Sequence, residues 1–112
     1  MTVTIEKGRA VGTVAAPPSK SMAHRLLICA ALSEGETVVH GIAESEDVRA
    51  TLDCLTALGA AAVLHGKSVT VRGVDPRRVT AKGELCCRES GSTLRFLIPL
   101  ALCMGKPVTF CG

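Results

Sequence analysis

The 112-residue sequence contains almost no aromatic side chains: two phenylalanines, no tryptophan and no tyrosine. A core must therefore be built from aliphatic side chains, cysteine and methionine, and a 47% hydrophobic content suffices for one small domain. The net charge of +3 is modest and spread along the chain. With few stacking rings and no basic cluster, nucleic-acid binding is disfavoured, and small anions are the better candidate ligands.

Long hydrophobic runs and paired metal-binding motifs are also missing. No apolar stretch reaches membrane-spanning length, and the alternating residues 1–7 do not resemble a signal peptide. We therefore expect a cytoplasmic protein that does not bind membranes. The six cysteines form no C-x-x-C pair, and the histidines do not recur at ligand spacing, which predicts reduced thiols and no metal or other cofactor. Cys29, Cys54 and Cys103 fall in apolar helical stretches and are expected to be buried.

The segment Pro17–Arg25 combines a stiff entry with a basic helix start. Two prolines favour extended backbone, after which a serine at 19 or 21 can cap a helix. Lys20, Ser21 and Arg25 then lie near the free amides of the first turn, and Ser21 and Arg25 share a helix face. Amides, a hydroxyl and two cationic groups favour a phosphate or carboxylate site. An ordinary serine-capped helix with solvated basic residues is the alternative.

A second candidate site is the segment Glu-Ser-Gly-Ser-Thr-Leu-Arg at residues 89–95, which begins another helix. Small side chains there let backbone amides approach a ligand, and Gly91 leaves room that a side chain would occupy. Alone, this segment is more simply interpreted as a helix cap. Together with the Lys20 segment it predicts a site for two anions.

Hydrophobic periodicity predicts alternating strands and helices. We expect helices over residues 19–32, 46–58 and 92–104, and strands over residues 2–6, 10–14, 37–40, 61–65, 68–73, 79–80, 84–87 and 106–111. This order predicts an α/β fold: a β-α-β-α-β-β unit with helices on one side of a sheet, and part of a second unit.

The same periodicity predicts the buried helix faces. The expected apolar positions are Met22, Leu26, Cys29 and Ala30 in the first helix, and Val48, Leu52, Leu55 and Leu58 in the second. The third helix is apolar almost all round, which predicts burial on several sides. Pro99 inside it predicts a kink.

The motif Pro-x-Ser-Lys-Ser-x-x-x-Arg at residues 17–25, with residues 89–95, resembles two N-terminal signatures of the 3-phosphoshikimate 1-carboxyvinyltransferase (EPSP synthase) family. The resemblance covers nearly the whole chain, but only the front of such an enzyme. It implies the family's inverted α/β barrel, here truncated. It also implies that residues 1–16 belong to the other globule, and residues 17–112 to part of the N-terminal domain.

The family transfers the enolpyruvyl group of phosphoenolpyruvate to the 5-hydroxyl of shikimate 3-phosphate, a step toward chorismate and the aromatic amino acids. By resemblance, Lys20 is catalytic and contacts both substrates, and Ser21 and Arg25 bind shikimate 3-phosphate. Gly91 and Ser92 hold the phosphate of phosphoenolpyruvate. Supporting roles fall to Glu89, Ser90 and Arg95.

The sequence also departs from the family pattern. Glu89 stands where many members have asparagine, and Ser92 where many have threonine. A carboxylate near an anion is unfavourable unless it turns away or pairs, and we expect Glu89 to pair with Arg88 or Arg95. Asp47 lies in a family-like Ser-x-Asp-Val stretch, but a charge at a helix start is its simpler interpretation.

The remaining family residues, a further arginine and the acid/base groups of the second globule, are expected beyond residue 112. We therefore expect this chain alone to be inactive, the complete enzyme to be monomeric, and the N-terminal strand to be able to pair with another copy. Three alternatives stay open: transfer to a nucleotide sugar, a non-catalytic anion-binding module, and a pure interaction scaffold. The scaffold does not explain the clustering of Lys20, Ser21 and Arg25.

Overall fold

The computed structural model describes residues 1–75, 77–79, 81 and 83–112. Its elements in chain order are α1 (Lys20–Ala31), β1 (Glu36–His40), α2 (Glu46–Ala57), β2 (Ala61–His65), β3 (Ser68–Arg72), β4 (Leu85–Cys86), α3 (Gly91–Cys103) and β5 (Phe110–Cys111). The three predicted helices and the strands of the central sheet are confirmed.

The main sheet has the strand order β1-β3-β2, and both pairings are antiparallel. The register aligns Val39, Val69 and Leu64 in one row, and Val69 is fully buried. The next row, with Val38 and Val63, is about half exposed. One face of the sheet is therefore buried, as alternation along each strand requires, and α1 and α2 cover that face, on one side of the sheet as predicted.

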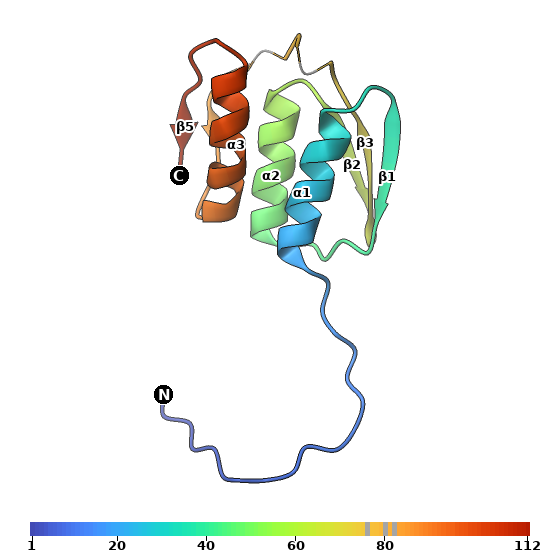
Figure 1. The fold of residues 1–112 in the computed structure, drawn as a ribbon, viewed down its shortest axis with the longest axis vertical. Helices are drawn as coiled ribbons and strands as arrows, with labels where there is room; N and C mark the ends of the chain where they lie inside the picture. The colour runs from blue at the N-terminus through green and yellow to red at the C-terminus, as the bar shows by residue number, and fades with distance from the viewer. Residues whose placement is uncertain (76, 80, 82) are drawn as a thin grey trace.

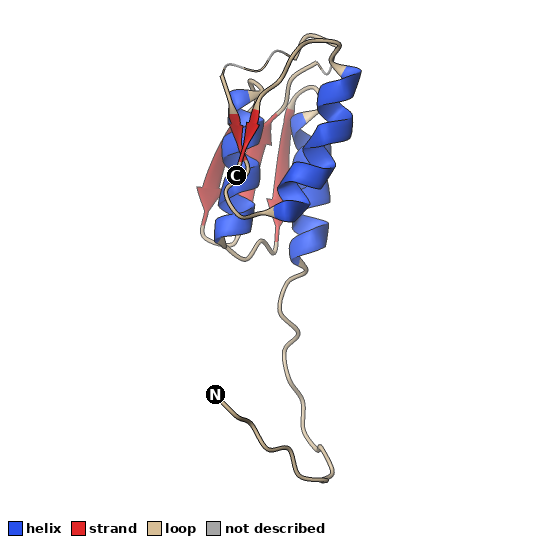
Figure 2. Ribbon diagram, turned by 90° about the vertical axis from the view of Figure 1, so that its left-hand side faces the viewer, coloured by secondary structure: helices blue, strands red, loops and turns tan. Residues whose placement is uncertain are grey.

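The helices lie side by side in Figure 1, and their buried faces form one core with the sheet. The side chains at its centre, all at most 1% exposed, are Leu27, Val48, Cys54, Leu55, Val69, Val71, Leu85 and Leu97. Alanines on α1 and α2 let the two helices approach closely, and no aromatic ring is part of the buried cluster in the described residues. Figure 2 shows β4 and β5 as a separate parallel pair.

The predicted strands at residues 2–6 and 10–14 are wrong for this chain. Residues 1–18 form no strand and extend away from the helices (Figures 1 and 2). The radius of gyration is accordingly 17.1 Å, whereas a compact chain of this length has about 13 Å. Ile5 and Val14 are at least 90% exposed. Strand-forming residues need a partner for their backbone groups, and no described part of the chain supplies one.

Two predictions of helix burial are also wrong. On α1, Met22, Leu26 and Cys29 are exposed, whereas Ala30 is buried as predicted; the other buried side chains are Ala23, His24, Leu27 and Ala31. The buried face is thus rotated by one residue, because small alanines face α2 and a histidine finds a polar partner there. On α3 only Thr93 and Leu97 are fully buried, and Leu102 is 78% exposed. The predicted face of α2 is confirmed, with Leu52 half-buried.

The last segments differ in detail from the sequence expectation. Helix α3 runs from Gly91 to Cys103 with Pro99 inside it, and the kink expected there stays a prediction. Strand β5 is shorter than the predicted 106–111, and the predicted strand at 79–80 includes a position outside the described residues. In the part of the chain that the structure describes, no helix is both long and apolar enough to cross a membrane.

All six cysteines carry free thiols. Cys54 and Cys87 are buried, whereas Cys29 and Cys103 lie on exposed helix faces, contrary to the prediction. Among the described residues, no group of three or more histidine, cysteine or carboxylate side chains could hold a metal ion.

Candidate active site

The N-terminal ends of α1, α2 and α3 point to the same end of the molecule (Figure 1). Each helix begins after a serine: Ser19, Ser45 and Ser90 accept hydrogen bonds at 3.3 Å from the amides of Met22, Val48 and Thr93, respectively. Serine caps satisfy one amide and leave others free. Three parallel helix dipoles therefore place their positive ends at one edge of the fold.

Lys20 lies on the first turn of α1 and reaches across to α2. Its Nζ is 3.2 Å from Asp47 Oδ2, and both side chains are partly exposed. Such a pair adds little to stability but holds the ammonium at the shared helix edge. The predicted role of Asp47 as a charge at a helix start is thus incomplete, because the carboxylate also orients Lys20.

Arg25 leans from α1 toward α3. Its guanidinium lies 5.1 Å from the centre of the Phe96 ring, and Nη1 donates to the carbonyl of Ser21 at 3.3 Å. A guanidinium over an aromatic face is attracted by the ring and loses little freedom when it binds an anion. Ser21 and Arg25 are therefore brought together, as their spacing predicts.

A buried chain of hydrogen bonds joins the three helices. His24 Nδ1 lies 2.7 Å from Thr51 Oγ1, which lies 2.7 Å from Thr93 Oγ1, which lies 2.7 Å from Ser90 Oγ. The carbonyl of Asp47 lies 3.2 and 3.4 Å from the two threonine hydroxyls. All four side chains of the chain are at most 4% exposed. Because buried polar groups lose free energy when unpaired, this network fixes the helix starts relative to one another.

Burial lowers the pKa of His24 from its usual 6.5; Asp47 opposes this effect, and Lys20 reinforces it. A neutral ring can accept the Thr51 proton at Nδ1. Each hydroxyl has one proton, so Thr51 and Thr93 must each divide it between a side-chain partner and the carbonyl of Asp47, to which both can donate.

This environment makes the stabilising effect of His24 depend on pH. The pKa of His24 in the folded state lies below its unfolded-state value of about 6.5. At pH values between these two pKa values, His24 is therefore protonated more often in the unfolded chain than in the folded chain. The contribution of neutral His24 to the free energy of unfolding is therefore complete above pH 6.5 and is lost as the pH falls through the folded-state pKa. We expect the difference in unfolding free energy between wild type and His24→Gln to shrink between pH 7.5 and 5. Urea unfolding at each pH measures it; a difference that grows on acidification would contradict the assignment.

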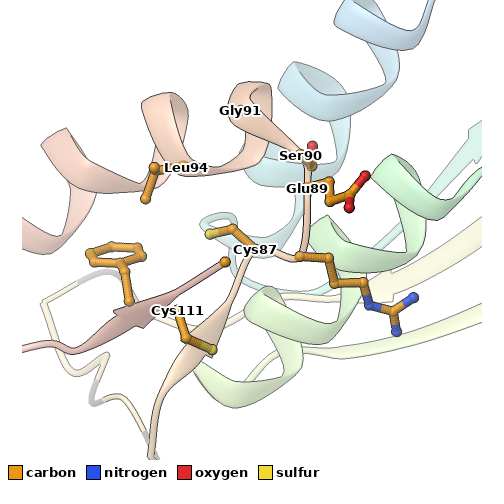
Figure 3. A pocket seen from close by; sticks show the side chains of 9 residues that line it. Cys87, Glu89, Ser90, Gly91, Leu94 and Cys111 are labelled. Carbon is orange, nitrogen blue, oxygen red and sulfur yellow. The ribbon is translucent and has the colours of Figure 1, made fainter.

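The second predicted segment borders a cavity of about 330 Å³. Figure 3 shows Cys87, Leu94 and Cys111 around it, with Ser90 and Gly91 at the start of α3. Within the described residues, the Ser92 amide makes no backbone hydrogen bond, so it is available to a ligand. The closest atom to a Cβ built on Gly91 would be Arg95 Nη2 at 3.9 Å, which places this guanidinium beside the helix start.

The expected pairing of Glu89 is not found. Arg88 instead binds two carboxylates of α2, with distances of 2.5 Å to Glu46 and 2.6 Å to Asp53. Arg88 has φ = 50°, an uncommon backbone conformation that the two ion pairs help to hold. In the described part of the chain Glu89 makes no ion pair, and Figure 3 shows its carboxylate on the side of the loop away from Leu94.

A second cavity of about 290 Å³ lies between the start of α2 and the loop before α3. It is lined by Glu46, Asp47, Arg88, Glu89 and Ser90. Its lining thus includes Asp47, which pairs with Lys20, and Ser90, which precedes Gly91. Lys20 and Gly91 themselves do not line it. The structure thus connects the two predicted segments through Asp47 and the buried network.

Sequence reasoning missed the network of His24, Thr51 and Thr93. Their partners lie 27 and 42 residues apart, and no local pattern links such positions. The only available signal was that polar residues occupy core-facing helix positions. Thr51 lies four residues after Asp47, and Thr93 lies three residues after Ser90.

The fold is an α/β layer whose three helix starts, with free amides and the basic side chains of Lys20 and Arg25, lie at one end of the molecule. Comparison with known proteins identifies the family of this chain. The family model for EPSP synthase (3-phosphoshikimate 1-carboxyvinyltransferase) matches residues 5–112, so the chain belongs to the EPSP synthase family.

Individual relatives agree with this family. The chain is 42% identical over 110 residues to the 3-phosphoshikimate 1-carboxyvinyltransferase of Clostridium perfringens (strain 13 / Type A), and 43% identical over 114 residues to that of Clostridium beijerinckii. It is similar to a solved EPSP synthase from Acinetobacter baumannii, with a TM-score of 0.71 and 31% identity over 80% of this chain. These matches cover 98%, 96% and 80% of the chain, but 26%, 26% and 20% of those proteins.

Proposed function

We propose that this chain supplies part of the active site of an enzyme that transfers the enolpyruvyl group of phosphoenolpyruvate to the 5-hydroxyl of shikimate 3-phosphate, releasing phosphate. The observation that carries the proposal is the convergence of the α1 and α3 starts, joined by a buried network. The family match supports the choice of substrates.

The reaction brings two polyanions together, so the site must offset their repulsion with fixed donors. Lys20, held at the shared helix edge, is suited to contact both substrates. Ser21 and Arg25 would bind shikimate 3-phosphate, since residues four apart share one face of α1 and a guanidinium and a hydroxyl both donate to phosphate. The ammonium of Lys20 would leave Asp47 or share its charge between carboxylate and ligand.

The α3 start would hold the phosphate of phosphoenolpyruvate. Gly91 leaves the approach open, and the amide of Ser92 is free to donate. Arg95 would support this contact from one turn further along, and Ser90 would fix the helix start through its cap and its bond to Thr93. Glu89 lines both cavities beside this helix start, so its carboxylate would have to remain turned away from the phosphate for the contact to form.

In the proposed chemistry, the 5-hydroxyl oxygen adds to C2 of phosphoenolpyruvate as its own proton is removed and a proton is added to C3, which gives a tetrahedral intermediate with a methyl group. The C2–O bond to phosphate then breaks as a methyl proton is removed, which restores the double bond and releases inorganic phosphate. Residues of this chain would bind and orient the anions and stabilise charge. The acid/base groups would come from the second globule of the complete enzyme, and no metal ion is required for the charge balance. This enzyme would work in the cytoplasm as a monomer.

The N-terminal segment supports a two-globule arrangement. Val3, Ile5, Val11 and Val14 expose at least 66% of their surface, which is costly for apolar side chains with strand-forming neighbours. We propose that residues 1–16 pack in the other globule and residues 17–112 form part of the N-terminal domain. In the absence of that globule, the same segment could pair with a second copy of this chain.

The test is an assay of the polypeptide encoded by the complete gene. Phosphate release is measured with phosphoenolpyruvate alone, with added shikimate 3-phosphate, and with UDP-N-acetylglucosamine in its place. The proposal predicts release only with shikimate 3-phosphate. Release only with the nucleotide sugar would favour the related transferase. Binding without turnover would favour an anion-binding module, and either result would contradict the proposal.

Gly91→Ala tests the open approach at α3. A Cβ there meets nothing closer than 3.9 Å within the chain, so we expect stability to change by less than about 1 kcal/mol. The methyl group would instead crowd the bound phosphate, and we expect the KM for phosphoenolpyruvate to rise about tenfold or more, with that for shikimate 3-phosphate nearly unchanged. Gly8→Ala, in the open N-terminal segment, is the matched control. An unchanged KM would remove Gly91 from the site.

A further inference from the structure

Strands β4 and β5 place two cysteines directly opposite each other. Their parallel pairing aligns Cys86 with Cys111, and backbone hydrogen bonds of 2.8 and 2.7 Å flank the pair, from Leu85 to Thr109 and from Cys87 to Cys111. Neighbouring strands lie about 4.8 Å apart, within the roughly 4.4–6.8 Å between Cα atoms that a disulfide spans. Residues in register on a parallel pair point to the same face, so the two thiols are adjacent.

We propose that Cys86 and Cys111 form a peroxide-sensitive thiol pair that closes into a reversible disulfide between β4 and β5. The proposal does not depend on the proposed enzymatic function. It uses two cysteines outside the Lys20 and Gly91 contacts, although Cys111 lines the cavity that Ser90 and Gly91 border.

The two thiols differ in reactivity. A hydrogen bond from Cys111, reinforced by the backbone amide of Arg88, lowers the pKa of Cys86, whereas donating that bond raises the pKa of Cys111 to about 11. The Arg88 guanidinium also favours the Cys86 thiolate, and Glu84 opposes it. Cys86 is exposed. An accessible thiolate with a thiol beside it is the arrangement of an attacking and a resolving cysteine.

The remaining cysteines lack this combination. Cys54 and Cys87 are buried together, and burial raises the pKa of Cys54 to about 12. Figure 3 shows the Cys87 side chain directed toward Leu94 and that of Cys111 directed away from α3. Cys29 and Cys103 are exposed, but each lies on a helix rather than opposite another cysteine in a strand pair.

The oxidation balances with hydrogen peroxide as the oxidant. The Cys86 thiolate attacks one peroxide oxygen, the O–O bond breaks, and a sulfenic acid and hydroxide form. The Cys111 sulfur then attacks the sulfenic sulfur, the S–O bond breaks, and oxygen leaves as water with the Cys111 proton. Two thiols are oxidised by two electrons, and one peroxide is reduced to two waters. A dithiol reductant reverses the reaction by exchange.

The experiment exposes the 112-residue chain to a short pulse of hydrogen peroxide, traps free thiols with N-ethylmaleimide and maps the tryptic peptides by mass spectrometry. We expect an intact mass lower by two hydrogens and a cross-link between the peptides containing Cys86 and Cys111, which dithiothreitol removes. Fragmentation between Cys86 and Cys87 identifies the linked sulfur in the wild type. We expect Cys86 to lose its free thiol about fivefold faster than Cys29.

Variants are needed to identify the cross-linked cysteine of the C-terminal peptide, because Cys103 lies in the same tryptic peptide as Cys111. Cys103→Ser should retain the cross-link, whereas Cys86→Ser and Cys111→Ser should each lose it. The substituted side chains of Cys86 and Cys103 are exposed, so these variants should fold. A cross-link that persists in Cys86→Ser, or peroxide that oxidises Cys29 and Cys103 while Cys86 stays reduced, would overturn the proposal.

Discussion

Lys20→Ala in the complete enzyme is expected to lower kcat/KM about a thousandfold or more while leaving the fold intact. Lys20 is the only residue to which we assign contact with both substrates, and its ammonium is held 3.2 Å from Asp47 at the meeting point of α1 and α2. Removing it would leave the two anions to repel each other. The partly exposed ion pair that is lost with it contributes less than about 1 kcal/mol to stability.

Steady-state kinetics with both substrates, alongside thermal unfolding, measures this effect. Lys67→Ala is the matched control, since Lys67 lies in the exposed turn between β2 and β3. Wild-type turnover in Lys20→Ala would refute the assigned role. A large loss of stability would mean that the lysine acts on the fold instead.

Arg25→Ala is expected to raise the KM for shikimate 3-phosphate about a hundredfold or more, with a smaller change for phosphoenolpyruvate. The guanidinium is positioned by the Phe96 ring at 5.1 Å and by the Ser21 carbonyl, so it offers a preformed fork to a phosphate. Arg25→Lys keeps the positive charge but loses the paired donors of the guanidinium. Its KM for shikimate 3-phosphate should therefore lie between those of the wild type and Arg25→Ala.

The control for Arg25 is Arg72→Ala, at the exposed end of β3. Substrate affinities measured by calorimetry separate binding from turnover. If Arg25→Ala changed only kcat and left both affinities intact, Arg25 would not bind the substrate phosphate, and the assignment of the α1 face would be wrong.

Local chemistry made much of the fold predictable. Serine caps, a glycine after α2, the β-branched residues of β1 and the alternating valines of β3 act over a few residues, and their elements appear where the sequence indicates. The candidate anion segments were predictable for the same reason, because a helix start and its basic side chains are local features. Residues 2–6 and 10–14 show the limit: they have strand chemistry, but a strand also needs a partner.

The orientation of α1 could not be predicted from apolar periodicity. Met22 and Leu26 are the larger apolar side chains, yet Ala23 and His24 are buried, since α2 offers Thr51 to the histidine and space for close approach to the alanine. The Lys20–Asp47 contact and the Arg88 ion pairs are likewise set by helix packing between distant parts of the sequence. Only tertiary structure reveals such partners.

If the starts of α1 and α3 form one site that binds both substrates, the backbone amides of both helix starts must respond when these ligands are added. Amide chemical shifts of the complete enzyme, followed while shikimate 3-phosphate and then phosphoenolpyruvate are added, measure this directly. We predict shifts at residues 19–25 with the first ligand and at residues 90–93 with the second, each enlarged when both are present. Shifts confined to one helix start, or centred on residues 61–72 of the sheet, would contradict a joint site.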